Sequence, residues 1–244
     1  MSNWKPWKIA RKELKVLRRK KSITFYVILL PLVLSVLFSL VVMNDIAPSS
    51  GIASNYQLGL ESLTYFFVVF AAILPASIAA YSIVGEKVEK SLEPLLATPV
   101  TDGEILLGKS IAAFVLPIPA IWAGASIFMA ATDYLTYNEL SYYYFPNWDS
   151  GVMLLLLAPL AAIFSIELAV IASSRVSDVR GANQIGGLMF IPFMGVFLAG
   201  VEGIITFDIN TLLFISAIVL IVDLALFFIS IKTFRREEIL TKWK

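Results

Sequence analysis

Six long apolar runs dominate the sequence and restrict what the chain can fold into. Hydrophobic residues make up 59% of its 244 residues and charged residues only 15%, a composition outside the range of soluble domains. About 20 apolar residues suffice to cross a bilayer as a helix, and the backbone must satisfy its own hydrogen bonds there. The sequence therefore predicts an all-α integral membrane protein with six transmembrane helices, at residues 23–43, 62–84, 110–131, 152–173, 184–201 and 212–231.

The positions of the nineteen Lys and Arg residues test this division independently. Nine precede the first run, three follow the second, two follow the fourth and five follow the sixth, whereas the other three loops contain none. Basic residues accumulate on the cytoplasmic side of membrane proteins. We therefore expect one multi-pass transmembrane domain, residues 1–244, in the cell membrane, with both termini and the loop at 85–109 in the cytoplasm.

The N-terminal segment, residues 1–22, combines dense positive charge with an apolar stripe. Trp7, Ala10, Leu14 and Leu17 recur at helical spacing between the basic residues. This pattern predicts an amphipathic helix in the cytoplasmic interface, with its cations toward anionic membrane lipids. The alternative is a solvated basic tail that only fixes the topology.

Two further segments have unusual composition. The loop after the third run is rich in tyrosine, which is typical of an aromatic belt at the outer interface; a carbohydrate or lipid platform is the alternative. The fifth run contains several Gly and a Pro, so it is expected either to kink or to break near Gly200, with residues 201–207 as a re-entrant segment.

Several kinds of chemistry are excluded, either because the residue types they need are missing or because the surrounding sequence does not fit them. The chain has no Cys and no His, which removes thiolate and zinc sites and His-based catalysis. Residues 103–110, GEILLGKS, match the pattern of a phosphate-binding loop, but a turn precedes them where that loop needs a strand, and bulky apolar residues fill their middle. We expect no catalytic residues, no metal, no cofactor and no nucleic-acid partner.

Two acidic residues lie within predicted spans. Asp223 lies near the middle of the sixth, and Glu167 lies in the cytoplasmic third of the fourth. Ionisable groups in a bilayer are costly and often mark a transport path. We therefore name both as possible translocation-path residues. The alternative is a structural role, in which Glu167 pairs with Arg175 or reaches the headgroups.

The cytoplasmic loop at 85–109 alternates acidic and basic residues with leucines, at spacings that predict a short amphipathic helix lying on the membrane surface. A turn at Thr98–Gly103 follows, and Thr101 or Asp102 could cap a second helix leading to Lys109 and into the third span. The loop is longer than a plain connector needs, which indicates a docking surface.

The motif residues of this loop resemble ABC-2 type permeases, the membrane subunits of type-2 ATP-binding-cassette transporters. The resemblance rests on Glu86, Leu92-Glu93, Leu95-Leu96, Thr98-Pro99-Val100 and Glu104–Lys109, and the six-span layout adds to it. Lys90-Ser91, where many relatives have Gly-Thr, and Pro94 depart from the pattern and affect where the coupling helix ends.

The resemblance implies a function. Two such chains, as a homodimer or with a paralogue, would form the path of an ATP-driven transporter, here expected to be an exporter. A separate cytoplasmic ATPase would carry ATP and Mg²⁺ and dock on the coupling helix. The coupling residues implied are Glu86, Glu89, Leu92, Glu93, Leu95, Leu96 and Thr98. Two alternatives remain: a membrane scaffold or assembly subunit that transports nothing, and an intramembrane enzyme, for which the sequence offers no catalytic set.

Overall fold

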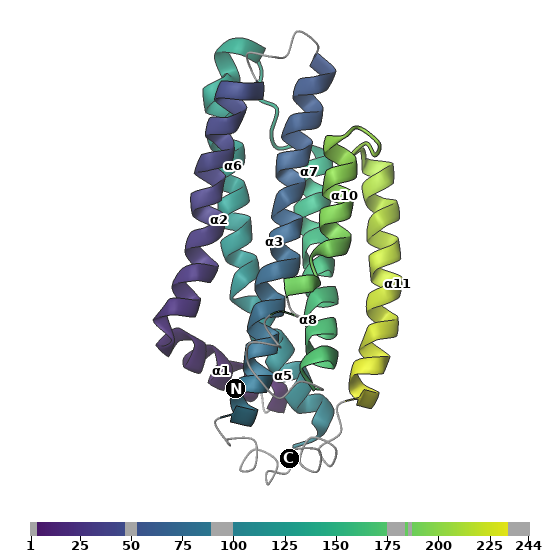
Figure 1. Cartoon of the computed structure of the whole chain (residues 1–244). Helices are drawn as coiled ribbons and strands as arrows, with labels where there is room; N and C mark the ends of the chain where they lie inside the picture. Colours follow the sequence, from purple (N-terminus) through teal and green to yellow (C-terminus); the bar gives the residue numbers. More distant parts are fainter. Residues whose placement is uncertain (1–3, 47–52, 89–99, 175–183, 185–186, 234–244) are drawn as a thin grey trace.

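The computed structural model describes residues 4–46, 53–88, 100–174, 184 and 187–233, and every regular element in that part of the chain is a helix (Figure 1). The all-α prediction is confirmed. The helices, in order, are α1 (Lys5–Arg19), α2 (Lys21–Val41), the π-helical turn η1 (Val42–Ile46), α3 (Ala53–Val88), α5 (Asp102–Val115), α6 (Pro117–Leu140), α7 (Trp148–Val152), the π-helical turn η2 (Met153–Leu157), α8 (Ala158–Ser174), α10 (Ile191–Val201) and α11 (Ile209–Thr233).

Five helical stretches in the described part of the chain are long and apolar enough to cross a membrane. Each overlaps one predicted span. The predicted fifth span, 184–201, corresponds to α10, which has only eleven residues, and part of its first half lies outside the described residues. The count of six spans therefore stays a prediction. The five stretches are Lys21–Asn44, Tyr56–Ser82, Gly103–Tyr137, Trp148–Ser173 and Ile209–Ser230.

Most helices extend beyond the predicted apolar runs. α3 begins nine residues before 62, and α6 ends nine residues after 131. Hydropathy locates the apolar centre of a helix, whereas capping and helix-breaking residues decide where it ends. The third span shows this, because it consists of α5 and α6 separated by a turn at Leu116. Pro117, which has no N–H to donate, opens the second of these helices.

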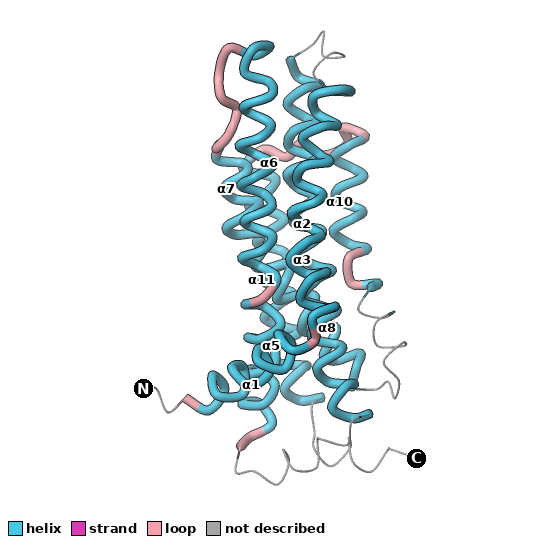
Figure 2. Tube along the Cα trace, turned by 90° about the vertical axis from the view of Figure 1, so that its left-hand side faces the viewer, coloured by secondary structure: helices cyan, strands magenta, loops and turns pink. Residues whose placement is uncertain are grey.

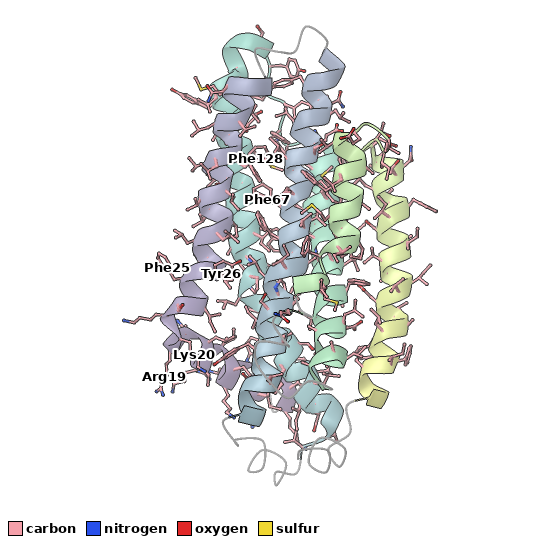
Figure 3. The ribbon with its side chains drawn as sticks, viewed as in Figure 1. Arg19, Lys20, Phe25, Tyr26, Phe67 and Phe128 are labelled. Carbon is pink, nitrogen blue, oxygen red and sulfur yellow. The ribbon has the colours of Figure 1, made fainter. Side chains whose placement is uncertain are left out.

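α3 forms the centre of the bundle. In its membrane-length window 78% of the residues are buried, against 28% for α2 and 17% for α11. Phe67 of α3 and Phe128 of α6 (Figure 3) are both fully buried, with ring centroids 5.8 Å apart. On another face of α3, small residues of α8 such as Ala158 and Ala162 are fully buried, which permits close helix packing.

α1 lies across one end of the bundle, and the last turn of α11 lies at that same end (Figures 1 and 2). The predicted two-faced helix is present: Ile9, Ala10 and Leu17 are buried, while basic residues such as Arg11 and Lys15 are exposed. One residue of the predicted apolar stripe is not on the buried face, since Trp7 is 44% exposed. The buried face of α1 packs on protein, mainly on α5.

The opposite end of the bundle is held together by loop contacts to α3. The Tyr144 hydroxyl donates a 2.8 Å hydrogen bond to Oε1 of Glu61. Burial, and then the neighbouring charge of Glu61, raise the pKa of Tyr144 above its ordinary value. The exposed Tyr134 and Tyr143 lie in the same region, in keeping with the predicted aromatic belt.

The connection between α10 and α11 is fixed against the core. α10 continues through Gly200 to Val201, and residues 202–208 form a turn and a short extended stretch with no re-entrant helix. Phe207 is fully buried and stacks on Tyr65 with 4.8 Å between ring centroids. Figure 1 shows this connection nearer the middle of the bundle than the ends of α3 and α6.

Asp208 begins the last helix. Its carboxylate accepts hydrogen bonds from the hydroxyls of Thr211 and Thr206, at 2.7 and 2.8 Å, and from the backbone N–H of Asn210 at 3.2 Å. These bonds favour the ionised form and hold the pKa of Asp208 below its ordinary value. The carboxylate thus acts as the N-terminal cap of α11.

Candidate functional site

The structure describes the loop at 85–109, predicted to be cytoplasmic, only at its two ends. α3 continues without a break through Glu86 to Val88, so Glu86 extends the second span and starts no separate helix. The other predicted coupling residues lie outside the described residues: Glu89, Leu92, Glu93, Leu95, Leu96 and Thr98.

The second helix predicted in the loop is confirmed, and Thr101 is its cap. Thr101 Oγ1 accepts a 3.3 Å hydrogen bond from the N–H of Glu104, and Glu104 Oε2 accepts one of 2.8 Å from the N–H of Thr101. This reciprocal capping box satisfies two backbone donors at the start of α5. The helix does not stop at Lys109 but runs on to Val115. The loop therefore joins two helices that belong to the membrane bundle.

A buried ionic network joins α1 to both helices that flank the loop. Lys109 Nζ of α5 lies 3.2 Å from Glu13 Oε1 of α1, and both residues are buried. The same ammonium donates hydrogen bonds of 2.9 Å to the carbonyl oxygen and to Oγ of Ser82 in α3. Ser82 Oγ in turn donates to Glu13 Oε2 at 3.2 Å. One carboxylate, one ammonium and one hydroxyl thus satisfy each other among three helices.

Close backbone contact reinforces the same junction. A Cβ atom on Gly108 would lie 2.7 Å from Cβ of Ile9 and 2.8 Å from the carbonyl oxygen of Pro6, so α1 can approach α5 only because this residue has no side chain. Gly103, by contrast, has open space around the same position. Contacts between helices therefore account for both Gly108 and Lys109 of the GEILLGKS segment.

A further contact lies where α1 meets α2. Lys20 (Figure 3) donates a hydrogen bond to the Tyr81 hydroxyl of α3, and its Nζ lies 4.5 Å from the centroid of that ring. Tyr81 precedes Ser82, so consecutive residues of α3 hold both the end of α1 and its middle. The N-terminal helix is therefore attached to the bundle at several points along its length.

Sequence reasoning missed this network, although one signal was present. Glu13 lies on the same helix face as Ile9, Ala10 and Leu17, so an acid interrupts an apolar stripe. A charge in that position needs a buried partner. The sequence could not identify the partner, because Lys109 lies 96 residues away.

The second candidate site contains the two membrane acids, which the structure brings together. Glu167 of α8 and Asp223 of α11 are both more than nine-tenths buried on packed helices, within range of each other's charge. Glu167 Oε2 and both carboxylate oxygens of Asp223 have no hydrogen-bond partner among the described residues. The alternative partner of Glu167, Arg175, lies outside the described residues.

The face that α11 turns inward carries polar side chains among its apolar ones. Ser216, Asp223 and Ser230 are its buried polar residues, while large apolar residues such as Phe214, Ile221 and Phe228 are about 70% exposed. A soluble helix would show the reverse arrangement. This face meets α8 along a line that we call the α8–α11 seam, defined by Glu167, Ser216, Asp223 and Ser230.

The comparison with known proteins supplies the family. No curated protein matches the chain. One family model, described as ABC-2 family transporter protein, matches residues 7–244, which is nearly the whole sequence. That match covers the N-terminal helix, the loop at 85–109 and all the apolar helices. The chain therefore belongs to the ABC-2 transporter family and is a multi-pass membrane protein of the permease type.

Proposed function

We propose that this chain is the permease subunit of an ATP-driven exporter. Two copies, or this chain and a paralogue, form the translocation path, and a separate cytoplasmic ATPase binds ATP and Mg²⁺ and docks on residues 86–98. The family match supports the permease role. Since the phosphate-loop-like segment 103–110 lies within helix α5, which packs on α1, ATP hydrolysis on a partner subunit is the simpler assignment.

The observation that carries the coupling proposal is the continuity of α3. This helix has 36 residues and runs from Ala53, at the end opposite α1, through the buried centre of the bundle to the docking loop. A continuous helix transmits axial and tilting movements over its length better than a broken one. An ATPase that pushes on the loop would therefore act directly on the most buried span.

The buried Glu13, Ser82 and Lys109 network supports a second route for that force. It ties α3, just before the loop, to α5, just after it, and both to α1. The two ends of the loop are therefore held at a fixed separation. A push on the loop then displaces the junction as a unit and is not absorbed by spreading of the two helices.

Copurification tests the docking surface. The double charge reversal Glu86→Lys/Glu93→Lys is expected to release the ATPase from the detergent-solubilised complex, because like charges across an interface are strongly unfavourable. The control is Glu202→Lys, a reversal of an exposed acid at the end of α10, which should leave the ATPase bound. A wild-type preparation without any bound ATPase would contradict the proposal.

Reconstituted transport separates the exporter from the scaffold alternative. Vesicles containing the complex should show ATP-dependent movement of substrate, and Asp223→Asn should reduce that movement while leaving assembly intact. If Asp223→Asn changes neither transport nor assembly, Asp223 does not belong to the path. A complex that hydrolyses ATP but moves nothing would favour the scaffold.

A further inference from the structure

A cavity of about 310 Å³ lies between α5, α8 and α11. Its wall is almost entirely apolar and includes the aromatic rings of Phe114 and Phe227. Leu107 and Ile163, also in its wall, are 36% and 38% exposed on the side of the bundle. The cavity therefore opens laterally, in the part of the bundle near α5 and the loop, where a ligand dissolved in the membrane could reach it.

One ionisable side chain lines this cavity among the residues described, and it is Glu167. Its exposed fraction is only 8%, and its Oε2 atom has no hydrogen-bond partner in the described structure. A carboxylate in apolar surroundings is costly unless it is paired. The cavity thus presents an acceptor that has no partner among the described residues around it.

A second buried carboxyl, that of Asp223, lies on α11 near the cavity wall. Asp223 is one helical turn from Phe227 on the same face of the helix, and it lies within range of the charge of Glu167. Neither of its carboxylate oxygens has a partner among the described residues. The two acids lie on the two helices that form the α8–α11 seam. Like charges disfavour each other's ionised form, so a bound cation would favour ionisation of both acids.

We propose that this cavity binds an amphipathic organic cation, a molecule with an apolar, preferably aromatic body and one ammonium-type charge. The cation would pair with Glu167, and its body would pack between Phe114 and Phe227. Aromatic faces also attract an ammonium group, which adds to the preference for a cation. Neutral molecules would leave the carboxyl without a partner, and anions would be repelled by both acids.

The lateral opening suits such a ligand. Amphipathic cations concentrate in the cytoplasmic leaflet, whose surface is negatively charged, and they can enter past Leu107 and Ile163 without leaving the membrane. As a statement about what the transporter moves, this proposal rests on the function proposed above. As a statement about a binding site, it concerns the permease alone and can be tested without the ATPase.

Binding to the purified permease in neutral detergent tests the proposal. The probe is benzyltrimethylammonium, and its comparator is 2-methyl-1-phenyl-2-propanol, a neutral molecule of nearly the same shape. Calorimetric titrations, corrected by titration into detergent alone, should show saturable binding of the cation that is at least about tenfold tighter than that of the alcohol.

Variants assign the binding to the cavity. Glu167→Gln should weaken cation binding by about tenfold or more and leave alcohol binding unchanged, whereas Glu167→Asp, which keeps the charge, should retain the preference for the cation. Asp223→Asn should weaken cation binding about threefold, since its charge acts over a longer distance. Ser126→Ala, at an exposed position of α6 outside the cavity wall, serves as the control. Gel filtration and thermal unfolding verify that each variant is folded.

Two results would overturn the proposal. The first is equal affinity of the wild-type protein for the cation and the alcohol. The second is a preference for the cation that persists in folded Glu167→Gln. A wild-type preparation without bound ATPase in the separate copurification assay would refute the proposed function but would leave this binding result intact.

Discussion

Lys109→Met offers the sharpest test of how α1 is attached to the bundle. The substitution removes the ammonium that binds Glu13 Oε1 at 3.2 Å and Ser82 at 2.9 Å, while it keeps the apolar stem of the side chain. Glu13 is 6% exposed and lies against Ile9 and Leu17. After the substitution its carboxylate keeps, among the described residues, only the hydrogen bond from Ser82, in a site that water hardly reaches.

The expected cost follows from that buried carboxylate. Removing one member of a buried ion pair typically destabilises a protein by about 3–5 kcal/mol, because the remaining charge has no compensation. For a chain of this length, that corresponds to a fall of roughly 6–20 °C in the midpoint of thermal unfolding. Lys15→Met on the exposed face of the same helix is the matched control, with an expected change within about 0.5 kcal/mol.

A double substitution separates the burial penalty from a loss of packing. In Glu13→Met/Lys109→Met both charges are absent, and apolar side chains of similar volume fill the space, so most of the stability should return. Thermal unfolding in detergent, read by tryptophan fluorescence, measures all three variants. If Lys109→Met is as stable as Lys15→Met, the buried network does not hold α1 in place, and the force route proposed through it is wrong.

Of three further predictions, two concern close contacts at glycines and one concerns a helix cap. Gly108→Ala should destabilise the protein by about 1–3 kcal/mol, because its Cβ would clash with α1, whereas Gly103→Ala should be neutral or stabilising by roughly 0.5–1 kcal/mol; equal effects in thermal unfolding would contradict the packing explanation. Gly200→Ala should cost about 1–3 kcal/mol, since its Cβ would lie 2.2 Å from the ring of Phe207, and unchanged unfolding would show that the ring moves freely. The contribution of Asp208 to folding stability should be complete above its ordinary pKa of 3.8 and be lost as the pH falls through its lower folded-state pKa. Asp208→Asn should therefore remove that part of the acid dependence of the unfolding midpoint.

The sequence predicted the membrane class and the centres of five spans, because hydropathy and the placement of Lys and Arg report directly on transfer into a bilayer. It did not predict most helix ends. α6 continues past residue 131 through Tyr134 and Tyr137, since polar and aromatic residues form helices as well as apolar ones do. The start of α5 was predictable from Thr101 and Glu104, a local capping pattern that needs no tertiary information.

The candidate sites likewise combine features that the sequence predicts with features that depend on helix packing. Glu167 and Asp223 could be named from the sequence because a charge within an apolar run is visible there. That they lie on facing helices beside a cavity could not be deduced, since it depends on which helices pack together and at which rotation. In the sequence, Lys109 matches the pattern of a phosphate-binding loop, whereas in the structure it pairs with Glu13. Glu13 lies in the strongly basic segment 1–22, where the sequence does not single it out as a partner.

The GEILLGKS segment shows why residue identity alone does not define a site. In a phosphate-binding loop the glycines expose backbone N–H groups, and the lysine follows them toward the phosphate. In a helix, neighbouring side chains point about 100° apart. Gly108 accordingly faces the backbone of α1, while Lys109 reaches between α1 and α3 to Glu13 and Ser82.

The two residues therefore make different kinds of contact with the same helix. At Gly108, α1 packs so closely that an added Cβ atom would lie 2.7 Å from Cβ of Ile9, which leaves little room for closer approach, and the charge on Lys109 opposes separation. A junction limited in both directions behaves as one body on the scale of small displacements. Under the proposed function, force applied to the loop between α3 and α5 would move α1 together with both spans, and α1 would then be part of the moving assembly and not a fixed anchor.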